Sequence, residues 1–284
     1  MQKKLKIGCG EWGYRELPME EHFRLCGKLG FKTMEFGMGG GQTGRLPARM
    51  DEKEVTDFLK MRDRHSIMTP FCCIENDFTL PDPAAHLRMV EEVLAQMRLA
   101  RRLEATHVRL FAGFTPVTRM DEAIWQRLMA AISNCANLGT KLGLQIALET
   151  HGRITTRNGA ALHEHTVTTD REALRRLAAA LPANVGFNYD PGNIKAVAPE
   201  DKRYALDLVN SRINYCHLKD WRRQGEGWIA AAPGDDDLDY ASLLEKMSYS
   251  GVCLIEYEPT GDVEDGILRS LNYFRRIGIQ LEFA

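Results

Sequence analysis

The chain has 284 residues, of which 27% are charged, and a formal net charge of −2. This composition excludes a largely disordered protein, and the lack of a basic excess argues against a nucleic-acid-binding protein. No apolar run approaches the ~18 residues of a membrane span, and the N-terminal segment MQKKLKIGCG has no apolar signal-peptide core. We therefore expect a cytoplasmic protein that does not bind membranes or nucleic acid.

The cysteines predict reduced thiols rather than a disulfide framework. There are seven, an odd number, and none forms a C-x-x-C pair. Most fall in apolar, strand-like runs, namely Cys9, Cys72, Cys73, Cys216 and Cys253. Small apolar side chains of this kind commonly fill the cores of cytoplasmic proteins.

Short apolar strands alternate with amphipathic helices along the whole chain. The predicted strands are Leu5–Gly10, Thr33–Met38, Ile67–Cys73, His107–Gly113, Leu144–Thr150, Val185–Asp190, Ile213–Asp220 and Val252–Glu258. The predicted helices span about 18–30, 51–64, 81–104, 121–138, 170–181, 199–210, 239–248 and 262–275. Four of them begin with an aspartate suited to cap a helix: Asp51, Asp121, Asp170 and Asp239.

Eight strands alternating with eight helices predict an α/β fold, a single (β/α)8 TIM barrel over residues 1–284. The rival is an open, doubly wound sheet, which normally carries a glycine-rich phosphate loop after its first strand. The segment Gly8–Gly13 contains G-x-G, but the third glycine comes one residue early and no helix follows at once. We therefore favour the closed barrel.

The last four strands each end in a side chain that can bind a metal. Because side chains alternate between the faces of a strand, the apolar face of each strand belongs against the helices. This places Glu149, Asp190, His217 and Glu256 inside the barrel, near its C-terminal end. Active sites of this fold lie at that end, so the four groups are expected to converge.

Three carboxylates and one imidazole suit Mn²⁺, Co²⁺, Mg²⁺ or Zn²⁺. The alternative is that each carboxylate pairs with a barrel cation, for which Arg109 and Lys219 are available. Three uncompensated carboxylates in one pocket would repel one another and take up protons unless a cation lay between them. The sequence therefore predicts one divalent cation held by all four residues.

At these residues the sequence resembles the sugar phosphate isomerase/epimerase superfamily, the xylose isomerase-like barrels. The resemblance is strongest in the segments Ala147–Gly152, Tyr189–Asn193, Cys216–Asp220, Pro233–Tyr240 and Leu254–Glu258. It implies that Glu149, Asp190, His217 and Glu256 bind one divalent cation, with Mn²⁺ favoured, and that the two glutamates exchange protons with a substrate carbon. Two departures are that Asn193 stands where the epimerases have histidine, and that the glycine-rich stretch before the seventh helix lacks its middle glycine.

The resemblance implies an isomerase or epimerase. Its substrate would be a keto-sugar, a polyol-derived ketone or a sugar phosphate, converted through a metal-stabilised enediolate. The alternative is a lyase or dehydratase at the same site, in which a β-hydroxyl or glycoside leaves. An abasic-site endonuclease is disfavoured, because it would need a histidine-rich three-metal cluster. A non-catalytic binding protein is disfavoured because the full ligand set is present.

Four further residues are expected to bind substrate: His151, Lys219, Arg109 and Asn193. For His151 and Lys219, support of the neighbouring metal ligands is an equally good interpretation. For Arg109, pairing with Glu35 across the barrel is the alternative.

Two long segments are candidate walls of the site. Residues 152–169 form either a lid with cations for an anionic substrate or a solvated, dimer-contacting loop, and the lid is slightly favoured. Residues 221–228 bring two tryptophans that suit a sugar ring. A homo-oligomer is the default assembly for such barrels.

Overall fold

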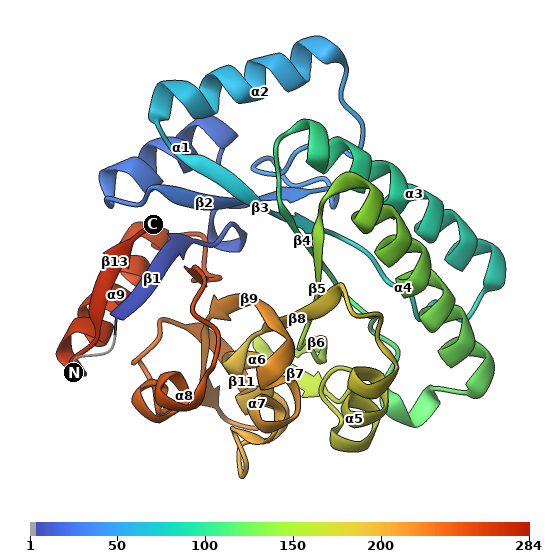
Figure 1. The fold of residues 1–284 in the computed structure, drawn as a ribbon. Coiled ribbons are helices and arrows are strands. Elements are labelled where there is room, and N and C mark those ends of the chain that lie inside the picture. The colour runs from blue at the N-terminus through green and yellow to red at the C-terminus, as the bar shows by residue number, and fades with distance from the viewer. Residues whose placement is uncertain (1–3) are drawn as a thin grey trace.

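The computed structural model describes residues 4–284, and eight parallel strands in it close into a barrel (Figure 1). Along the ring the strands run in chain order, and the last pairs with the first through Ile7–Cys9 and Cys253–Ile255. The barrel strands are β1 (Lys4–Cys9), β2 (Thr33–Met38), β3 (Met68–Ile74), β4 (His107–Leu110), β5 (Gln145–Glu149), β8 (Val185–Tyr189), β9 (Ile213–Leu218) and β12 (Cys253–Ile255). The predicted (β/α)8 barrel is confirmed.

The helices surround this ring, as Figure 1 shows. Eight of them match the predicted ones: α1 (Met19–Lys28), α2 (Glu52–His65), α3 (Pro83–Arg102), α4 (Glu122–Leu142), α5 (Arg171–Ala180), α7 (Tyr204–Val209), α8 (Tyr240–Lys246) and α9 (Val263–Arg276). All four predicted caps are confirmed, because each aspartate side chain accepts a hydrogen bond from a backbone N–H of the first turn. None of the described helices is both long enough and apolar enough to span a bilayer.

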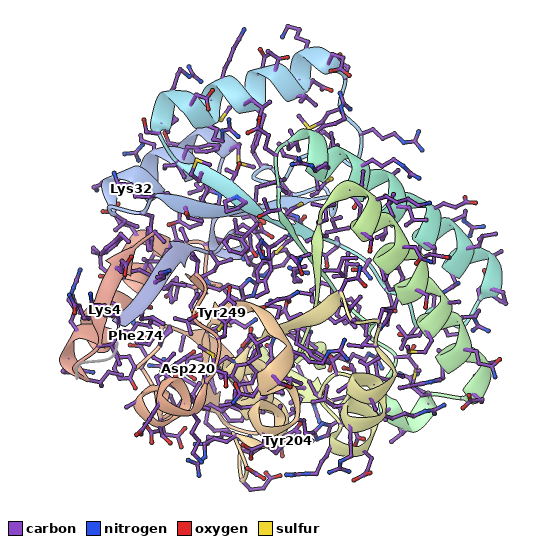
Figure 2. All side chains as sticks on the ribbon, viewed as in Figure 1. Lys4, Lys32, Tyr204, Asp220, Tyr249 and Phe274 are labelled. Atoms are coloured by element: carbon purple, nitrogen blue, oxygen red, sulfur yellow. The ribbon has the colours of Figure 1, made fainter. Side chains whose placement is uncertain are left out.

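The alternation of side chains along the strands separates an apolar layer from a polar interior. Ile146, Leu148, Phe187 and Tyr189 face the helices and belong to the main hydrophobic core. Inside the ring, a small apolar plug of Phe71, Ala147, Tyr215 and Leu254 fills the middle of the barrel. Figure 2 shows side chains crowding the centre of the ring, so the barrel is not a pore. The polar groups discussed below lie at the C-terminal ends of these strands.

The main sheet contains a ninth strand, outside the eight-membered ring. β13 (Gln280–Phe283) pairs in parallel with Lys4–Ile7, the first part of β1, whereas β12 pairs with the last part. β1 therefore has two successive neighbours on the same side. The two ends of the described chain lie close together, at the left of Figure 1.

Two hairpins extend the barrel in the segments that we predicted as a lid and a wall. The first, β6 (Arg153–Arg157) and β7 (Ala160–Glu164), follows β5; the second, β10 (Asp220–Gln224) and β11 (Gly227–Ala231), follows β9. They join into one four-stranded sheet through the pairing of Trp228 with Ala161. The interpretation of residues 152–169 as a loop is therefore wrong, and the predicted strand Ile213–Asp220 ends at Leu218.

A short helix, α6 (Pro191–Val197), also stands where no helix was predicted. A proline is well tolerated in the first turn of a helix, where no intrahelical N–H bond is lost. The Asp190 carboxylate caps the helix by accepting from Asn193 N at 3.0 Å. A Cβ on Gly192 would lie 2.6 Å from the Lys219 carbonyl oxygen, so glycine lets α6 approach the end of β9.

Candidate metal centre and cavity

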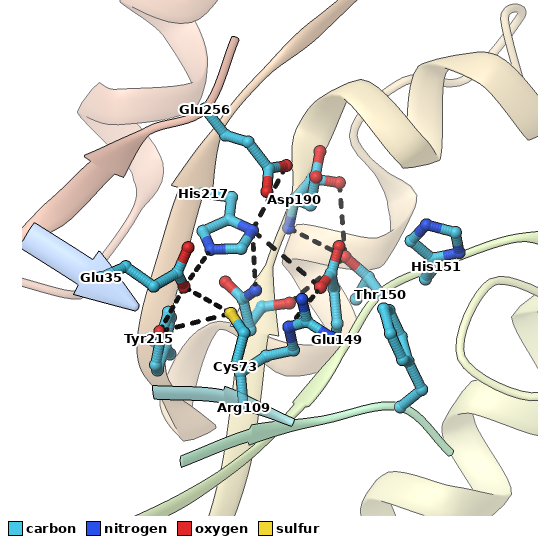
Figure 3. Close-up of polar contacts among 12 residues, drawn as sticks. Glu35, Cys73, Arg109, Glu149, Thr150, His151, Asp190, Tyr215, His217 and Glu256 are labelled. Carbon is cyan, nitrogen blue, oxygen red and sulfur yellow. Dashed lines mark hydrogen bonds and ion pairs between the residues drawn. The ribbon is translucent and has the colours of Figure 1, made fainter. Parts of the chain in front are cut away.

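The four predicted ligands converge at the mouth of the barrel (Figure 3). One oxygen or nitrogen from each of Glu149, Asp190, His217 and Glu256 lies within 4.8 Å of the others. Donors at ~2.0–2.2 Å around one ion would be separated by distances of this order. All four side chains are buried, at most 4% exposed.

The two nitrogens of His217 have different partners. Nε2 lies 2.8 Å from Glu35 Oε1, and the opposite nitrogen, Nδ1, lies 3.5 Å from Glu256 Oε2 and 4.0 Å from Glu149 Oε2 (Figure 3). Glu35 accepts from Nε2–H, so the Nδ1 lone pair points into the cluster. Asn188 Nδ2 lies 3.1 Å from Nδ1, and a cation bound to this nitrogen would replace the contact. A carboxylate bonded to the distal nitrogen is the usual partner of a metal-binding histidine.

Two cations compensate part of the negative charge. Lys219 Nζ lies 3.2 Å from Asp190 Oδ2, 3.1 Å from Glu256 Oε2 and 2.8 Å from Glu258 Oε1. Arg109 Nε lies 3.0 Å from Glu149 Oε2. The premise of three uncompensated carboxylates is therefore wrong, and Arg109 lies against Glu149 rather than Glu35. Four carboxylates, those of Glu149, Asp190, Glu256 and Glu258, lie against these two cations.

The Glu149 carboxylate has an unused oxygen. Arg109 Nε lies near Oε2, but its N–H does not point at this oxygen closely enough to form a hydrogen bond. No other group in residues 4–284 donates to this buried oxygen. Its second oxygen, Oε1, accepts from Asn193 Nδ2 at 3.1 Å. A buried carboxylate oxygen without a donor is costly, and a cation would satisfy it. The donor set and this orphan oxygen fit a divalent cation.

The acidities of the two glutamates diverge. Burial raises the pKa of Glu149 to about 7, against the attraction of Arg109 and His217. Burial also acts on Glu256, but His217 and Lys219 outweigh it and lower its pKa. Two carboxyl groups with separated pKa values can divide the roles of proton donor and acceptor.

His217 would lose a proton to solvent when a cation binds. Burial lowers its pKa, but the surrounding carboxylates, Glu256 and Glu35 foremost, outweigh this and raise it to about 10. A divalent cation among the same carboxylates would supply the positive charge that this proton supplies, so the two compete.

A cavity of about 450 Å³ opens onto the cluster, within the size range of small-molecule sites. Glu149 and Glu256 line it, and so do His151, Lys219 and Arg109. Its aromatic walls are Trp12, Phe111, Phe114 and Trp221. The first hairpin contributes Ile154, Thr156 and Ala161 to the cavity lining, and all three are uncharged. This part of the wall therefore does not carry the cations that we expected of a lid over residues 152–169.

Asp190, His217 and Asn193 are buried behind this wall. Asn193 donates from Nδ2 to both Glu149 Oε1 and Asp190 Oδ2, at 3.1 and 3.0 Å, and its own Oδ1 accepts from Trp221 Nε1 at 3.3 Å. Its amide therefore holds two candidate ligands in place.

His151 presents a neutral imidazole to the cavity. Burial lowers its pKa well below the ordinary value, and Lys219 and His163 add to this. Nδ1 donates to the Gly152 carbonyl at 2.6 Å, which leaves the Nε2 lone pair free to accept a hydrogen bond. The phenyl rings of Phe111 and Phe114 lie edge-on to it, with centroids 5.0 and 5.6 Å away.

The supporting roles of three residues were not predicted from the sequence. Glu35 and Asn188 bond to the two nitrogens of His217, and Thr150 Oγ1 accepts from Asp190 N at 2.9 Å. Asn188 lies on the same strand face as Asp190, so the alternation of β8 could have indicated its inward direction. For Glu35, the inward direction of a carboxylate on an otherwise apolar β2 was the available signal.

The comparisons with known proteins agree with this architecture. The family model described as a xylose isomerase-like TIM barrel matches residues 23–277. No curated protein matches the sequence.

Three of the similar solved structures cover nearly the whole chain. A protein titled D-tagatose 3-epimerase-like aligns over 98% of this chain and 98% of its own, with 16% identity and a TM-score of 0.71. The 3-keto-D-glucoside 4-epimerase of E. coli aligns over 96% and 100%, with 14% identity and a TM-score of 0.72. The IOLI protein, solved with a zinc atom, aligns over 96% and 97%, with 16% identity and a TM-score of 0.74.

Proposed function

Since the chain belongs to the xylose isomerase-like TIM barrel family, we propose that it is a divalent-metal-dependent isomerase or epimerase of carbonyl-containing carbohydrates. One observation carries the proposal. Of the four residues in the candidate metal cluster, Glu149 and Glu256 line the cavity, whereas Asp190 and His217 are buried behind it. Two carboxylates therefore touch both the ion and the space for a substrate.

The similar structures support this reaction class. Two of the three compared above carry epimerase in their titles, and the third was solved with zinc. For the present chain Mn²⁺ is our preferred ion, because three oxygen ligands and one nitrogen suit it, although Co²⁺, Mg²⁺ and Zn²⁺ suit the same set. We place the enzyme in the cytoplasm.

The chemistry divides between the two glutamates. When bound, the cation polarises the substrate carbonyl and stabilises the enediolate that deprotonation of the adjacent carbon produces. Glu256, whose pKa is lowered, is the group ready to accept the carbon-bound proton. Glu149, the other candidate ligand that lines the cavity, is the group that can return a proton. Return to the other face gives an epimer, and return to the neighbouring carbon gives an isomer.

The remaining cavity groups orient the substrate. His151 Nε2 accepts from a substrate hydroxyl, and Lys219 Nζ donates to a substrate oxygen while it holds Glu256. Arg109 also lines the cavity, and its Nη1 is buried without a hydrogen-bond partner in the described part of the chain. For Asn193 we now propose a positioning role, because its amide is already bonded to Glu149 and Asp190.

The walls favour an uncharged keto-sugar over a sugar phosphate. Each cation of the cavity already has a protein partner: Lys219 has three carboxylates, Arg109 has Glu149, and Arg15 Nη1 donates to the carbonyls of Trp12 and Glu258. The four aromatic rings provide flat apolar surfaces for the C–H faces of a sugar or cyclitol ring.

A lyase is the second candidate, and the position of Lys219 favours it. Its ammonium group lies in the cavity wall, 3.1 Å from Glu256 Oε2, where it can protonate a leaving β-hydroxyl once Glu256 has taken the carbon-bound proton. One of the similar structures, with 13% identity, is titled a probable 3-DHS dehydratase.

Solvent-deuterium exchange tests the proposal. The chain loaded with Mn²⁺ should exchange the carbon-bound proton next to the carbonyl in at least one member of a keto-sugar, inosose and 3-keto-glycoside panel, as detected by NMR. Glu149→Gln and Glu256→Gln should each slow exchange by about 10²–10⁴-fold, the usual contribution of a general acid or base. Loss of hydroxide or aglycone in the same spectra identifies the lyase.

The matched control is Glu122→Gln, an exposed glutamate on α4 that pairs with Arg176. It should exchange at the wild-type rate. Undiminished exchange in the Glu256→Gln protein would refute the assignment of the base.

A further inference from the structure

A second cluster of metal-binding side chains lies outside the barrel wall, between β1 and α1. Cys9 comes from the end of β1, on the face that packs against the helices, and His22 and Cys26 come from α1. One ligand atom of each lies within 4.8 Å of the other two. The two cysteines are 0% exposed and the histidine 1%, so the cluster is sealed from solvent.

The imidazole of His22 has no ordinary partner. Neither Nδ1 nor Nε2 has a hydrogen-bond partner among residues 4–284. The ring stacks on Tyr14, with centroids 4.1 Å apart and planes at 14°. A neutral imidazole carries one donor and one acceptor, and leaving such groups unsatisfied in a core destabilises the fold. A buried histidine of this kind requires an explanation, and an ion is one.

The spacing of the three residues suits a shared ion. His22 and Cys26 are four residues apart, so they project from the same side of α1, one turn from each other. Cys9 faces them from the strand. A thiolate, not a thiol, is the form that binds a metal.

We propose that Cys9, His22 and Cys26 bind a thiophilic cation of the zinc type, separate from the oxygen-rich cluster in the cavity. Two thiolates and an imidazole are ligands for Zn²⁺, and soft sulfur donors disfavour Mn²⁺ and Mg²⁺. The Tyr14 hydroxyl lies 3.4 Å from Cys9 Sγ, beside the three ligands. Binding displaces the two thiol protons to solvent and leaves the imidazole neutral.

The ion would fasten α1 to β1 next to the active site. Two residues after Cys9, Glu11 N donates to Glu35 Oε2 at 3.0 Å, and Glu35 in turn holds His217. The end of β1 therefore supports the geometry of the cavity cluster. The proposed role is structural, and it does not depend on which reaction the cavity performs.

Cobalt substitution distinguishes the two centres. Full-length protein produced in Co²⁺-supplemented medium should show a thiolate-to-cobalt charge-transfer band in the near ultraviolet, which oxygen and nitrogen ligands do not give. Cys26→Ser should lose this band and one cobalt per chain. Glu256→Gln should keep the band. The matched control Cys135→Ser should also keep it, because that thiol is buried on α4, away from the proposed site.

Three results would overturn the proposal. The first is a cobalt-loaded wild-type protein without the band, a measurement that needs no variant to fold. The second is a band that persists in a folded Cys26→Ser protein. The third is an intact mass two hydrogens lighter than the reduced chain, with the loss absent from Cys9→Ala, which would identify a Cys9–Cys26 disulfide instead.

Discussion

His217 is held on both sides, and this makes it the most constrained residue of the candidate metal centre. Glu35 bonds to Nε2, and the Glu35 carboxylate also accepts from the Tyr215 hydroxyl and the Cys73 thiol (Figure 3). All these side chains are fully buried or nearly so. The direction of the Nδ1 lone pair therefore depends on a carboxylate that would not touch the ion.

Glu35→Gln is expected to weaken binding of Mn²⁺ about 10–100-fold, the usual effect of losing an outer partner of a metal-binding histidine. The amide is nearly the same size, so the barrel should stay folded. Titration calorimetry with wild-type and variant protein measures the change. Glu164→Gln, an exposed glutamate of the first hairpin, is the control. An unchanged affinity would mean that Glu35 does not orient His217.

The sequence predicted the four candidate ligands because strand periodicity fixes which side chains point inward. The alternation of β5, β8, β9 and β12 required nothing beyond the chain itself. The pairing of Arg109 with Glu149, rather than Glu35, could not be predicted in this way. Such a choice depends on distances across the ring, which tilt and stagger of the strands determine.

The two hairpins form the outer wall of the cavity and are joined to the barrel by buried polar contacts. Lys195 of α6 makes the main connection. Its Nζ lies 2.8 Å from Asp220 Oδ1, at the start of β10, and 3.1 Å from Asp236 Oδ2, and the side chain is 1% exposed. Trp221, the next residue of β10, lines the cavity.

Lys195→Met is expected to lower the free energy of unfolding by about 3–5 kcal/mol, because it leaves the buried Asp220 carboxylate without its cation. Urea unfolding followed by circular dichroism measures this. Lys202→Met removes a neighbouring lysine that is 22% exposed and pairs with exposed Asp237, and it should cost less than about 1 kcal/mol. Equal losses in the two variants would contradict a special role for the buried pair.

His163 should make the hairpins sensitive to acid. Its ring lies edge-on to Trp221, with centroids 4.7 Å apart. Burial, reinforced by Lys219, lowers its pKa to about 3, whereas an unfolded chain titrates near about 6.5. Above the higher value His163 is neutral in both states. As the pH falls from about 6.5 toward about 3, only the unfolded chain gains this proton, so the free energy of unfolding decreases.

Urea unfolding at about pH 7.5 and about pH 5 measures the effect. His163→Phe keeps an aromatic edge against Trp221 but cannot titrate, so it should lose less stability between the two pH values than the wild type. Identical pH dependence of the two proteins would remove His163 as the cause.

The first hairpin could have been predicted, and the second could be predicted only in part. Asn158-Gly159 is the turn sequence of a two-residue hairpin, and both residues have positive φ, 51° and 76°. The long spacing between β5 and α5 obscured this signal. In the second hairpin only Gly225, with φ 57°, marks the turn, and pairing of the two hairpins depends on contacts between segments far apart in the chain.

At the scale of the molecule, eight repeats of one strand–helix unit were enough to predict the closed barrel. The repeat is a local pattern, and closure follows from strand number. β13 was not predicted, because four residues of alternating exposure next to the end of the sequence are too short a pattern to indicate a strand. Its pairing with β1 depends on the twist of the finished ring, which no local pattern encodes.

Addition of the cation is expected to stabilise the whole fold. Because the four candidate ligands come from four different strands, unfolding would release the ion, and binding should raise the free energy of unfolding by about 2.7 kcal/mol at ~100 times the Kd. Thermal unfolding with and without Mn²⁺ measures this. EDTA should reverse the gain, and Asp190→Asn should abolish it. A melting temperature that does not change on addition of Mn²⁺ would argue against the candidate metal centre.

The burial of Asp190 and His217 behind Glu149 and Glu256 has a consequence for the order of events. An ion seated among these four residues meets solvent on the side where the substrate also sits. A bound substrate would therefore block the path between the ion and solvent. The ion would have to bind before the sugar and could dissociate only after the sugar had left. Turnover would then follow an ordered sequence, and a saturating sugar would slow the escape of the ion into a chelator.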